Sequence, residues 1–158
     1  MGVFVFNVAR GRVAELANRV NQNDPTNAAF VLVCLKAAGL EADSVMKQHT
    51  NLDNLLAAAN DEATNTGYAR KVLNQASGIT VTVDQDNNRV DVDFPNQTWT
   101  AVQAAGGAWG AILVCYDPDT TSGTDSTIIP LTKQDFVITP DGRDIDAQVV
   151  DTGFYRDS

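Results

Sequence analysis

The side chains of this sequence that are best suited to covalent chemistry are two cysteines and one histidine. Cys34 and Cys115 each lie inside an apolar run, whereas His49 lies in a polar stretch. A thiol nucleophile needs a base beside it, and a zinc site needs closely spaced cysteines and histidines. The sequence shows neither pattern. We therefore expect two reduced core thiols, a histidine at the surface and no zinc site, because a buried free cysteine behaves as a small hydrophobe.

A pair of carboxylates is the second candidate for chemistry. Asp91 and Asp93 are two residues apart in an alternating run, so they lie on the same face of a predicted strand. Two enclosed carboxyl groups can act as general acid and base. Both belong to the polar face of the strand, however, where solvated acids are expected. We therefore predict a protein that is not an enzyme and has no catalytic residue.

Cofactor binding is also not expected. The glycine-containing segment at 106–110 lacks both the dinucleotide fingerprint and a P-loop lysine. Its glycines are better explained by a tight bend before the next strand. We therefore predict no bound cofactor.

Two further features keep a binding role open. The loop from Asp117 to Asp125 is rich in oxygen ligands, although its spacing does not match the EF-hand pattern for calcium. Trp99 and Trp109 could stack on sugar rings, but tryptophans pack more often in a core or an interface. A host-surface or carbohydrate-binding module, with or without calcium in the loop, therefore stays open as an alternative.

Hydrophobic periodicity predicts the helices that would position these residues. Apolar residues at helical spacing predict an amphipathic helix over residues 8–21. A second helix is expected from Leu52 to about residue 60, with Thr50 or Asn51 as its N-cap. Residues 43–48 are expected to form a short helical turn.

The rest of the chain is predicted to form short strands separated by turns. Strict alternation predicts a hairpin of strands at 79–84 and 89–94. Other strands are expected at 28–35, 68–73, 97–101, 109–116, 126–130, 135–139, 147–150 and 153–156. The pattern predicts a mainly β (α+β) fold, an antiparallel β-sandwich or barrel of about seven to nine short strands with two helices in the N-terminal third. The length fits a single domain, 1–158.

The charge balance excludes some classes of partner. The 158 residues include 20 acidic and 11 basic side chains, for a net charge of −9. Nucleic acids and anionic membranes are recognised by basic patches, so we expect neither as a partner. No apolar run is long enough to cross a membrane. Aspartate outnumbers glutamate by 17 to 3, which fits a turn-rich β protein because aspartate favours turns.

The N-terminal segment is a local exception to this acidity. Arg10, Arg12 and Arg19 outnumber the single acid of the predicted first helix. Residues 1–24 are therefore either an ordinary first strand and helix or a docking segment for an acidic partner. As a docking segment, they provide six interface candidates: Val3, Phe4, Phe6, Arg10, Arg12 and Arg19.

An ordered series of short motifs resembles a known family over nearly the whole chain. The motifs lie at 6–13, 35–43, 62–71, 89–93, 97–100, 113–120, 128–132, Asp135-Phe136 and Gly153-Phe154. Each is weak alone, and the series is specific as a set. The chain resembles a family of small virion structural proteins of tailed bacteriophages, particularly those that infect actinobacteria.

The resemblance implies a virion component without catalysis. We expect a capsid decoration or minor capsid protein, made in the host cytoplasm and bound to the major capsid protein at the capsid surface. Such a protein would form a homo-oligomer, and a trimer would fit the three-fold positions of a shell. A tail or head–tail joining protein is the alternative that the resemblance leaves open.

Overall fold

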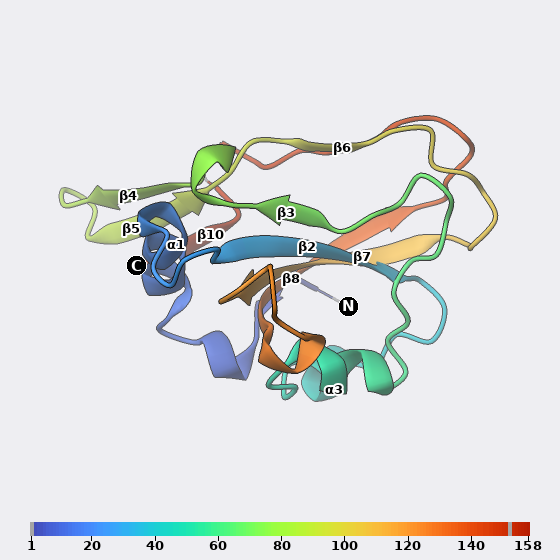
Figure 1. Ribbon diagram of the computed structural model, residues 1–158, viewed down its shortest axis with the longest axis horizontal. Helices are drawn as coiled ribbons and strands as arrows, with labels where there is room; N and C mark the ends of the chain where they lie inside the picture. The colour runs from blue at the N-terminus through green and yellow to red at the C-terminus, as the bar shows by residue number, and fades with distance from the viewer. Residues whose placement is uncertain (1, 152) are drawn as a thin grey trace.

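A five-stranded antiparallel sheet forms the centre of the computed structural model, which describes residues 2–151 and 153–158 (Figure 1). Its strand order is β1-β8-β7-β2-β3. The strands are β1 (Phe4–Val5), β8 (Ile129–Ile138), β7 (Trp109–Asp117), β2 (Ala29–Lys36) and β3 (Lys71–Leu73). The middle strand β7 lies between β2, which is far from it in the chain, and β8, which is joined to it by a long loop.

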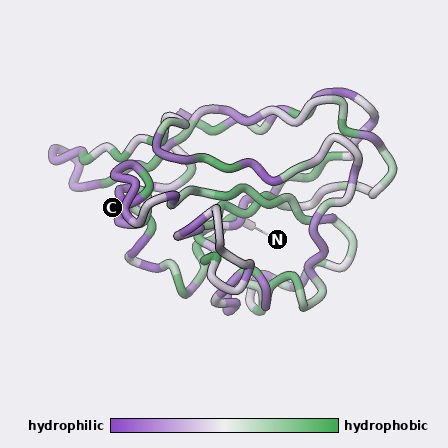
Figure 2. The backbone as a smooth tube through the Cα atoms, in the orientation of Figure 1, coloured by the Kyte–Doolittle hydropathy of each residue, from purple (hydrophilic) through white to green (hydrophobic). Residues whose placement is uncertain are grey.

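Strands β2 and β7 occupy the middle of this sheet because they are apolar on both faces. Every residue of β7 is buried, and so is every residue of β2 except Lys36. A strand covered on both sides has a continuous apolar run rather than an alternating one. The green stretch in the middle of Figure 2 follows these strands. The predicted strands at 28–35 and 109–116 are confirmed.

Two smaller sheets cover one end and one side of the central sheet. One has the order β10-β5-β4, and the other pairs β6 with β9. Their strands are β4 (Thr80–Asp84), β5 (Arg89–Asp93), β10 (Tyr155–Asp157), β6 (Gln97–Trp99) and β9 (Ile145–Ala147). The predicted hairpin is confirmed as β4 and β5. Only the inner half of its apolar face is buried, because its tip projects beyond the body and leaves Val83 exposed (Figure 1).

Three α-helices lie in the first third of the chain, with short 3-10 turns beside them. The helices are α1 (Val13–Gln22), α2 (Asp43–Met46) and α3 (Leu52–Ala57). The 3-10 turns are η1 (Asn7–Ala9), η2 (Gln75–Ser77) and η3 (Asp125–Thr127). The helical turn expected at 43–48 is α2, and Asn51 caps α3 by accepting a hydrogen bond from the Asn54 N–H.

The first helix begins later than predicted. Gly11 has a φ of +73°, a conformation that breaks a helix, so α1 starts at Val13 rather than at residue 8. It ends at Gln22, and the next residue, Asn23, adopts the left-handed conformation typical of a helix C-terminus. Four apolar residues of α1 face the core as the periodicity predicted: Val13, Leu16, Ala17 and Val20.

Several strand boundaries differ from those predicted. The strands expected at 126–130 and 135–139 are one continuous strand, β8, because Pro130 lies at a register shift where the ladder is already irregular. The strand expected at 68–73 shortens to β3. Near the C-terminus, β9 and β10 replace the strands expected at 147–150 and 153–156. The antiparallel, mainly β fold class is confirmed.

The two tryptophans lie inside the core. Trp99 and Trp109 are almost completely buried, and their rings meet edge to face at 5.4 Å. The Trp109 indole N–H donates to Asn65 Oδ1 at 2.9 Å. The Asn65 amide donates in turn to the carbonyls of Gln103 and Gly107. The core interpretation of the tryptophans is confirmed, and a sugar-binding platform made from these two rings is wrong.

The buried amide of Asn65 supplies the first test of the core. We expect Asn65→Ala to lower the free energy of unfolding by about 2–4 kcal/mol, because it leaves the Trp109 N–H and two carbonyls without partners. Urea denaturation measures this change. Asn18→Ala on the exposed face of α1 is the control and should change stability by less than about 0.5 kcal/mol. Equal effects of the two substitutions would contradict the role of Asn65.

Candidate functional site

A buried lysine organises the N-terminal end of the molecule. Lys133 lies on β8 directly opposite Phe4 of β1, and its side chain is completely buried. Its Nζ donates to the Gly2 carbonyl at 3.0 Å, to Asp43 Oδ1 at 3.1 Å and to Asp135 Oδ1 at 2.5 Å. The ammonium also lies 5.7 Å from the centre of the Phe4 ring. We call Gly2, Asp43, Lys133 and Asp135 the Lys133 network.

The network satisfies the electrostatic demands of a buried charge. An ammonium has three donors, and here each finds an oxygen acceptor. A buried charge without partners would cost several kcal/mol, so the network holds these segments together. Burial works against ionisation of Asp43, but hydrogen bonds from Lys133 and from the Gly2 N–H outweigh it and hold the pKa of Asp43 below its ordinary value.

Three exposed valines lie close in the chain to residues of this network. Val3 is 65% exposed, Val45 is 49% exposed and Val137 is 77% exposed. Each lies within two residues of Gly2, Asp43 or Asp135, so all three are close to the network. Exposed apolar groups gathered in one place typically mark an interaction surface. We call these three valines, together with the Lys133 network, the N-terminal corner.

The predicted interface residues of the first strand divide between surface and core. Val3 is exposed and belongs to the N-terminal corner. Phe4 is partly buried beneath the surface, over Lys133. Phe6 is completely buried and packs edge to face with Phe4 at 5.0 Å, so its assignment to an interface is wrong. A phenylalanine in a continuous apolar run such as residues 3–6 cannot be assigned to surface or core from sequence alone.

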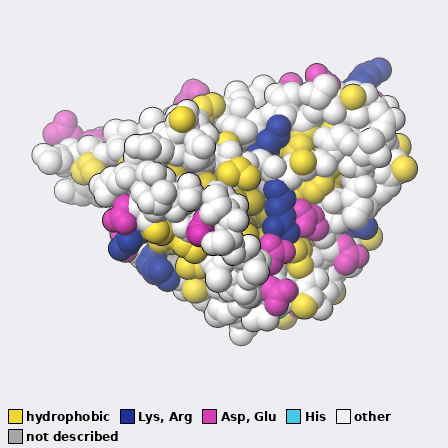
Figure 3. All heavy atoms as spheres, viewed as in Figure 1, with side chains coloured by type: hydrophobic (Ala, Val, Ile, Leu, Met, Phe, Trp, Pro, Cys, Tyr) yellow, Lys and Arg dark blue, Asp and Glu magenta, His cyan; other side chains and the backbone are white. Residues whose placement is uncertain are grey.

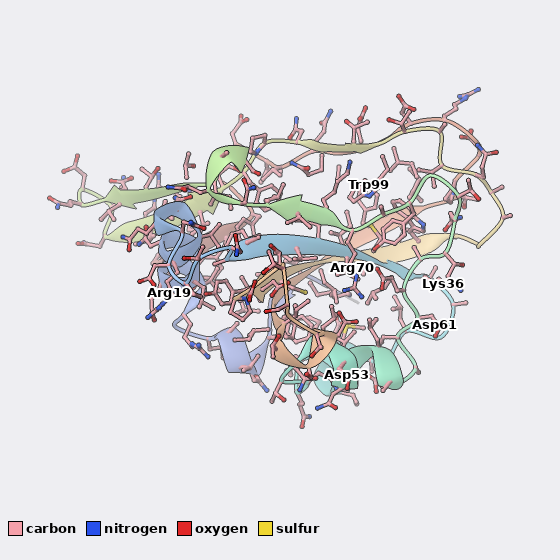
Figure 4. All side chains as sticks on the ribbon, in the orientation of Figure 1. Arg19, Lys36, Asp53, Asp61, Arg70 and Trp99 are labelled. Carbon is pink, nitrogen blue, oxygen red and sulfur yellow. The ribbon has the colours of Figure 1, made fainter. Side chains whose placement is uncertain are left out.

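Arg19 lies on α1, away from the N-terminal corner, whereas Arg10 donates to Asn7, whose N–H binds the Lys47 carbonyl at the end of α2. Arg10, Arg12 and Arg19 are all exposed, but Arg10 and Arg12 precede α1 instead of lying on it. Arg19 pairs with Glu15 at 3.1 Å, and this hydrogen bond raises its pKa. Helix α1 packs against β4 and β5, whereas β1 pairs with β8. Figure 4 shows Arg19 on α1 at one end of the molecule. Residues 1–24 therefore contribute to two separate surfaces.

The carboxylates considered for acid–base chemistry are held in structural contacts. Asp91 accepts two hydrogen bonds from Arg156 and also lies 3.5 Å from Arg89. The Arg156 hydrogen bonds hold the pKa of Asp91 below its ordinary value. Asp93 caps the backbone N–H of Phe94. The two acids thus point to different partners rather than to a shared substrate position.

The acidic loop from Asp117 to Asp125 uses its oxygens internally. Asp119 accepts hydrogen bonds from Ser122 and Thr121, which lower its pKa to about 2. Asp117 is buried and accepts the Asp119 N–H, and burial raises its pKa. Within residues 2–151 and 153–158, no group of three or more His, Cys, Asp or Glu side chains is placed to hold a metal ion. The geometry therefore gives the calcium alternative no support.

A charge cluster that sequence patterns did not indicate joins distant parts of the fold. Arg70 forms paired hydrogen bonds with Glu62 and with Asp125. Tyr68 donates to Glu62 and accepts the Cys34 N–H of β2. Figure 4 shows Arg70 close to the central sheet, and Figure 3 shows acidic and basic side chains side by side on this face. Asp125 is 55 residues from Arg70, a pairing that no local pattern predicts.

The cysteines and the histidine differ in how well they match expectation. Both thiols are buried and unpaired, and burial raises the pKa of each, so they remain protonated as core residues. This prediction is confirmed. His49 is only 18% exposed and its Nε2 lies 2.7 Å from Glu41 Oε2, so the expectation of a free surface histidine is wrong. Glu41 in turn accepts from the Asn60 amide.

Comparisons with known proteins identify no relative from which a role could be transferred. No protein-family model, no curated protein and no solved structure matches this chain. In the described residues, no helix is both long and apolar enough to span a bilayer. The assignment of a function therefore rests on the residues and surfaces described above.

The Arg70 cluster predicts a specific acid dependence of stability. Hydrogen bonds from Arg70 lower the pKa of Asp125. The pair therefore stabilises the fold at pH values above the ordinary Asp pKa, and this stabilisation is lost as the pH falls through the lowered pKa of Asp125. We expect Arg70→Gln to cost about 1–3 kcal/mol at neutral pH, because the cluster is only half-buried. Near pH 2, about two units below the ordinary Asp pKa, the cost should shrink.

Urea denaturation at the two pH values measures this difference. Arg143→Gln is the matched control, because Arg143 is almost fully exposed and lies 3.7 Å from Asp141. The control should have little effect on stability at either pH. A loss for Arg70→Gln that is the same at both pH values would show that Asp125 does not titrate through this pair.

Proposed function

We propose that this chain is a non-enzymatic virion structural protein of a tailed bacteriophage, a capsid decoration or minor capsid protein bound to the major capsid protein. The proposal combines the motif series, which resembles such a family, with one structural observation. That observation is the N-terminal corner, where three exposed valines lie close in the chain to two acids that are both paired with the buried Lys133.

The corner suits docking because covering its paired acids costs less desolvation than covering unpaired acids elsewhere on the surface. The chain as a whole carries a net charge of −9, and most acidic surfaces would lose hydration in a contact. At the corner, Asp43 and Asp135 are already paired with Lys133. A partner that covers Val3, Val45 and Val137 therefore gains apolar burial, and the two half-buried acids lose less hydration than unpaired acids would.

The remaining side chains support binding rather than catalysis. The groups considered for chemistry are engaged elsewhere: the thiols are core residues, Asp91 binds Arg156, and Asp119 binds its own loop. Perturbed and enclosed acid–base groups are what an active site requires. A structural role uses the exposed apolar surface and leaves these groups as supports of the fold.

Two further parts of the proposal concern location and assembly. The protein would be made in the host cytoplasm and would lie on the outer surface of the capsid as a homo-oligomer, with a trimer matching three-fold positions. A tail or head–tail joining protein is the second candidate, because the same apolar corner could face a tail subunit. The carbohydrate-binding alternative loses its main support, since Trp99 and Trp109 are buried.

The copy number in purified virions tests the proposal and separates its two forms. Quantitative mass spectrometry compares the amount of this chain with the amount of the major capsid protein. A decoration protein should be present in a number comparable with that of the shell subunits. A handful of copies per particle would overturn the decoration role and favour the tail or joining role, and absence from the particle would overturn both.

A substitution at the corner tests which surface docks. We expect Val137→Asp to lower the affinity for shells that lack this protein by at least about tenfold, because a carboxylate would be buried in an apolar contact. Co-sedimentation with such shells measures the affinity. Val72→Asp is the matched control, since Val72 is half-exposed on β3 at the other edge of the sheet. Equal losses for both variants would contradict docking through the corner.

A further inference from the structure

A cavity of about 210 Å³ lies on the face of the central sheet opposite Lys133. Its floor contains Leu32, Ile112 and Val114, and the register places Leu32 beside Val114 and Ile112 beside Gln134. Gln134 follows Lys133 in β8, so the two side chains point to opposite faces. The walls come from Phe94, Phe154 and the segment 147–150.

The cavity is small, and residues 134–136 of β8 form part of its lining. Its rim includes three exposed residues: Asp135, Gln148 and Val150. Pockets that take whole drug-sized ligands measure about 300–1,000 Å³, so this cavity is too small for one of them. Its size and its apolar floor suit one large apolar side chain instead.

The backbone beside the cavity has an open edge. Strand β1 pairs only with Lys133 and Thr132 of β8. The pairing of β1 with β8 stops there because the backbone of Gly2 is engaged elsewhere. The Gly2 N–H donates to Asp43 and the Gly2 carbonyl accepts from Lys133, so Gly2 does not pair with β8. In the described part of the chain, residues 134–138 therefore have no strand neighbour on that side.

We propose that this open edge and the cavity together bind an extended segment of another protein. The segment would add a strand to residues 134–138 of β8 and insert one apolar side chain into the cavity. In strand addition, main-chain hydrogen bonds provide affinity and pockets for alternate side chains provide specificity. A strand beside β8 directs every second side chain toward the face that carries the cavity.

The charges at the rim define the chemistry of the segment further. Asp135 is the only charged residue among the described residues that line the cavity, and the whole chain is acidic. Asp135 Oδ1 binds Lys133, whereas Oδ2 forms no hydrogen bond or ion pair in the described residues. The segment therefore carries a lysine or arginine next to its apolar anchor, because charge complementarity selects the partner.

The same edge is poorly suited to a second copy of this chain. Between the pairs Ala111–Asp135 and Trp109–Ile138, one residue of β7 faces two of β8, which is a bulge. This bulge bends the edge, which a flexible peptide can follow and the rigid edge of a second copy cannot. Two copies that each carry −9 also repel one another. The edge shares Asp135 and Val137 with the N-terminal corner, but the inference does not require the proposed virion role.

Selection from a random library tests the inference on the full-length protein. The probe is a library of extended peptides of about ten residues, the number that covers an edge strand with flanking residues. The expected enriched peptides combine β-branched residues, one large apolar residue and an adjacent lysine or arginine. Ala147→Phe, which narrows the cavity, should weaken their binding at least about tenfold.

A rim variant tests the charge without changing the core. Gln148→Lys adds a cation to the lining that Gln148 shares with Asp135 and should weaken binding of the basic peptides by about two- to fivefold. Gln85→Lys at the hairpin tip and Val72→Phe on β3 are the matched controls and should bind like the parent protein. Thermal unfolding confirms that each variant is folded.

Three results would overturn the inference. One is a selection that enriches the same peptides on Ala147→Phe as on the parent protein, or enriches none on either. Another is enrichment of acidic peptides. The third is a dimer in sedimentation experiments, together with protection of residues 134–138 from hydrogen exchange in that dimer. The second copy would then occupy the edge. None of these measurements uses virions, so they stand apart from the test of the proposed function.

Discussion

The need to neutralise one buried ammonium determines the N-terminal end of this molecule. Lys133 is enclosed beneath β1, and its three donors require the Gly2 carbonyl, Asp43 and Asp135. Because Gly2 is used in this way, β1 ends early, α2 is held beside the strand, and the outer edge of β8 stays open. The open edge is therefore a consequence of this ion-pair network rather than a separate feature.

Most of the acidic charge that dominates the composition supports the fold locally. Asp125 is held by Arg70, Asp91 by Arg156, and Asp119 by hydroxyl and backbone donors of its own loop. The net charge of −9 therefore describes solubility better than it describes a binding site. Arg19 on α1 lies on a second surface, away from the N-terminal corner. The predicted single docking segment at the N-terminus therefore contributes to two surfaces at different places on the molecule.

The parts of the fold that depend on local pattern could be predicted from the sequence. Alternation identified the β4–β5 hairpin, continuous apolar runs identified β2 and β7, and an Asx cap identified the start of α3. Long-range pairings could not be predicted in this way. Asp43 is 90 residues from Lys133 and Asp125 is 55 residues from Arg70, so no periodicity connects them. The burial of Phe6 is also beyond local pattern, because its run, residues 3–6, is apolar throughout and does not show which face is covered.

A cryo-EM map of the intact particle tests the central claim, that the chain docks through its N-terminal corner, most directly. The account predicts repeated density for this fold on the capsid, with Val3, Val45 and Val137 against the major capsid protein and the β4–β5 hairpin away from that contact. Density in which these valines face solvent, or in which the α1 arginines contact the shell instead, would contradict it. Density confined to the tail would contradict the capsid location.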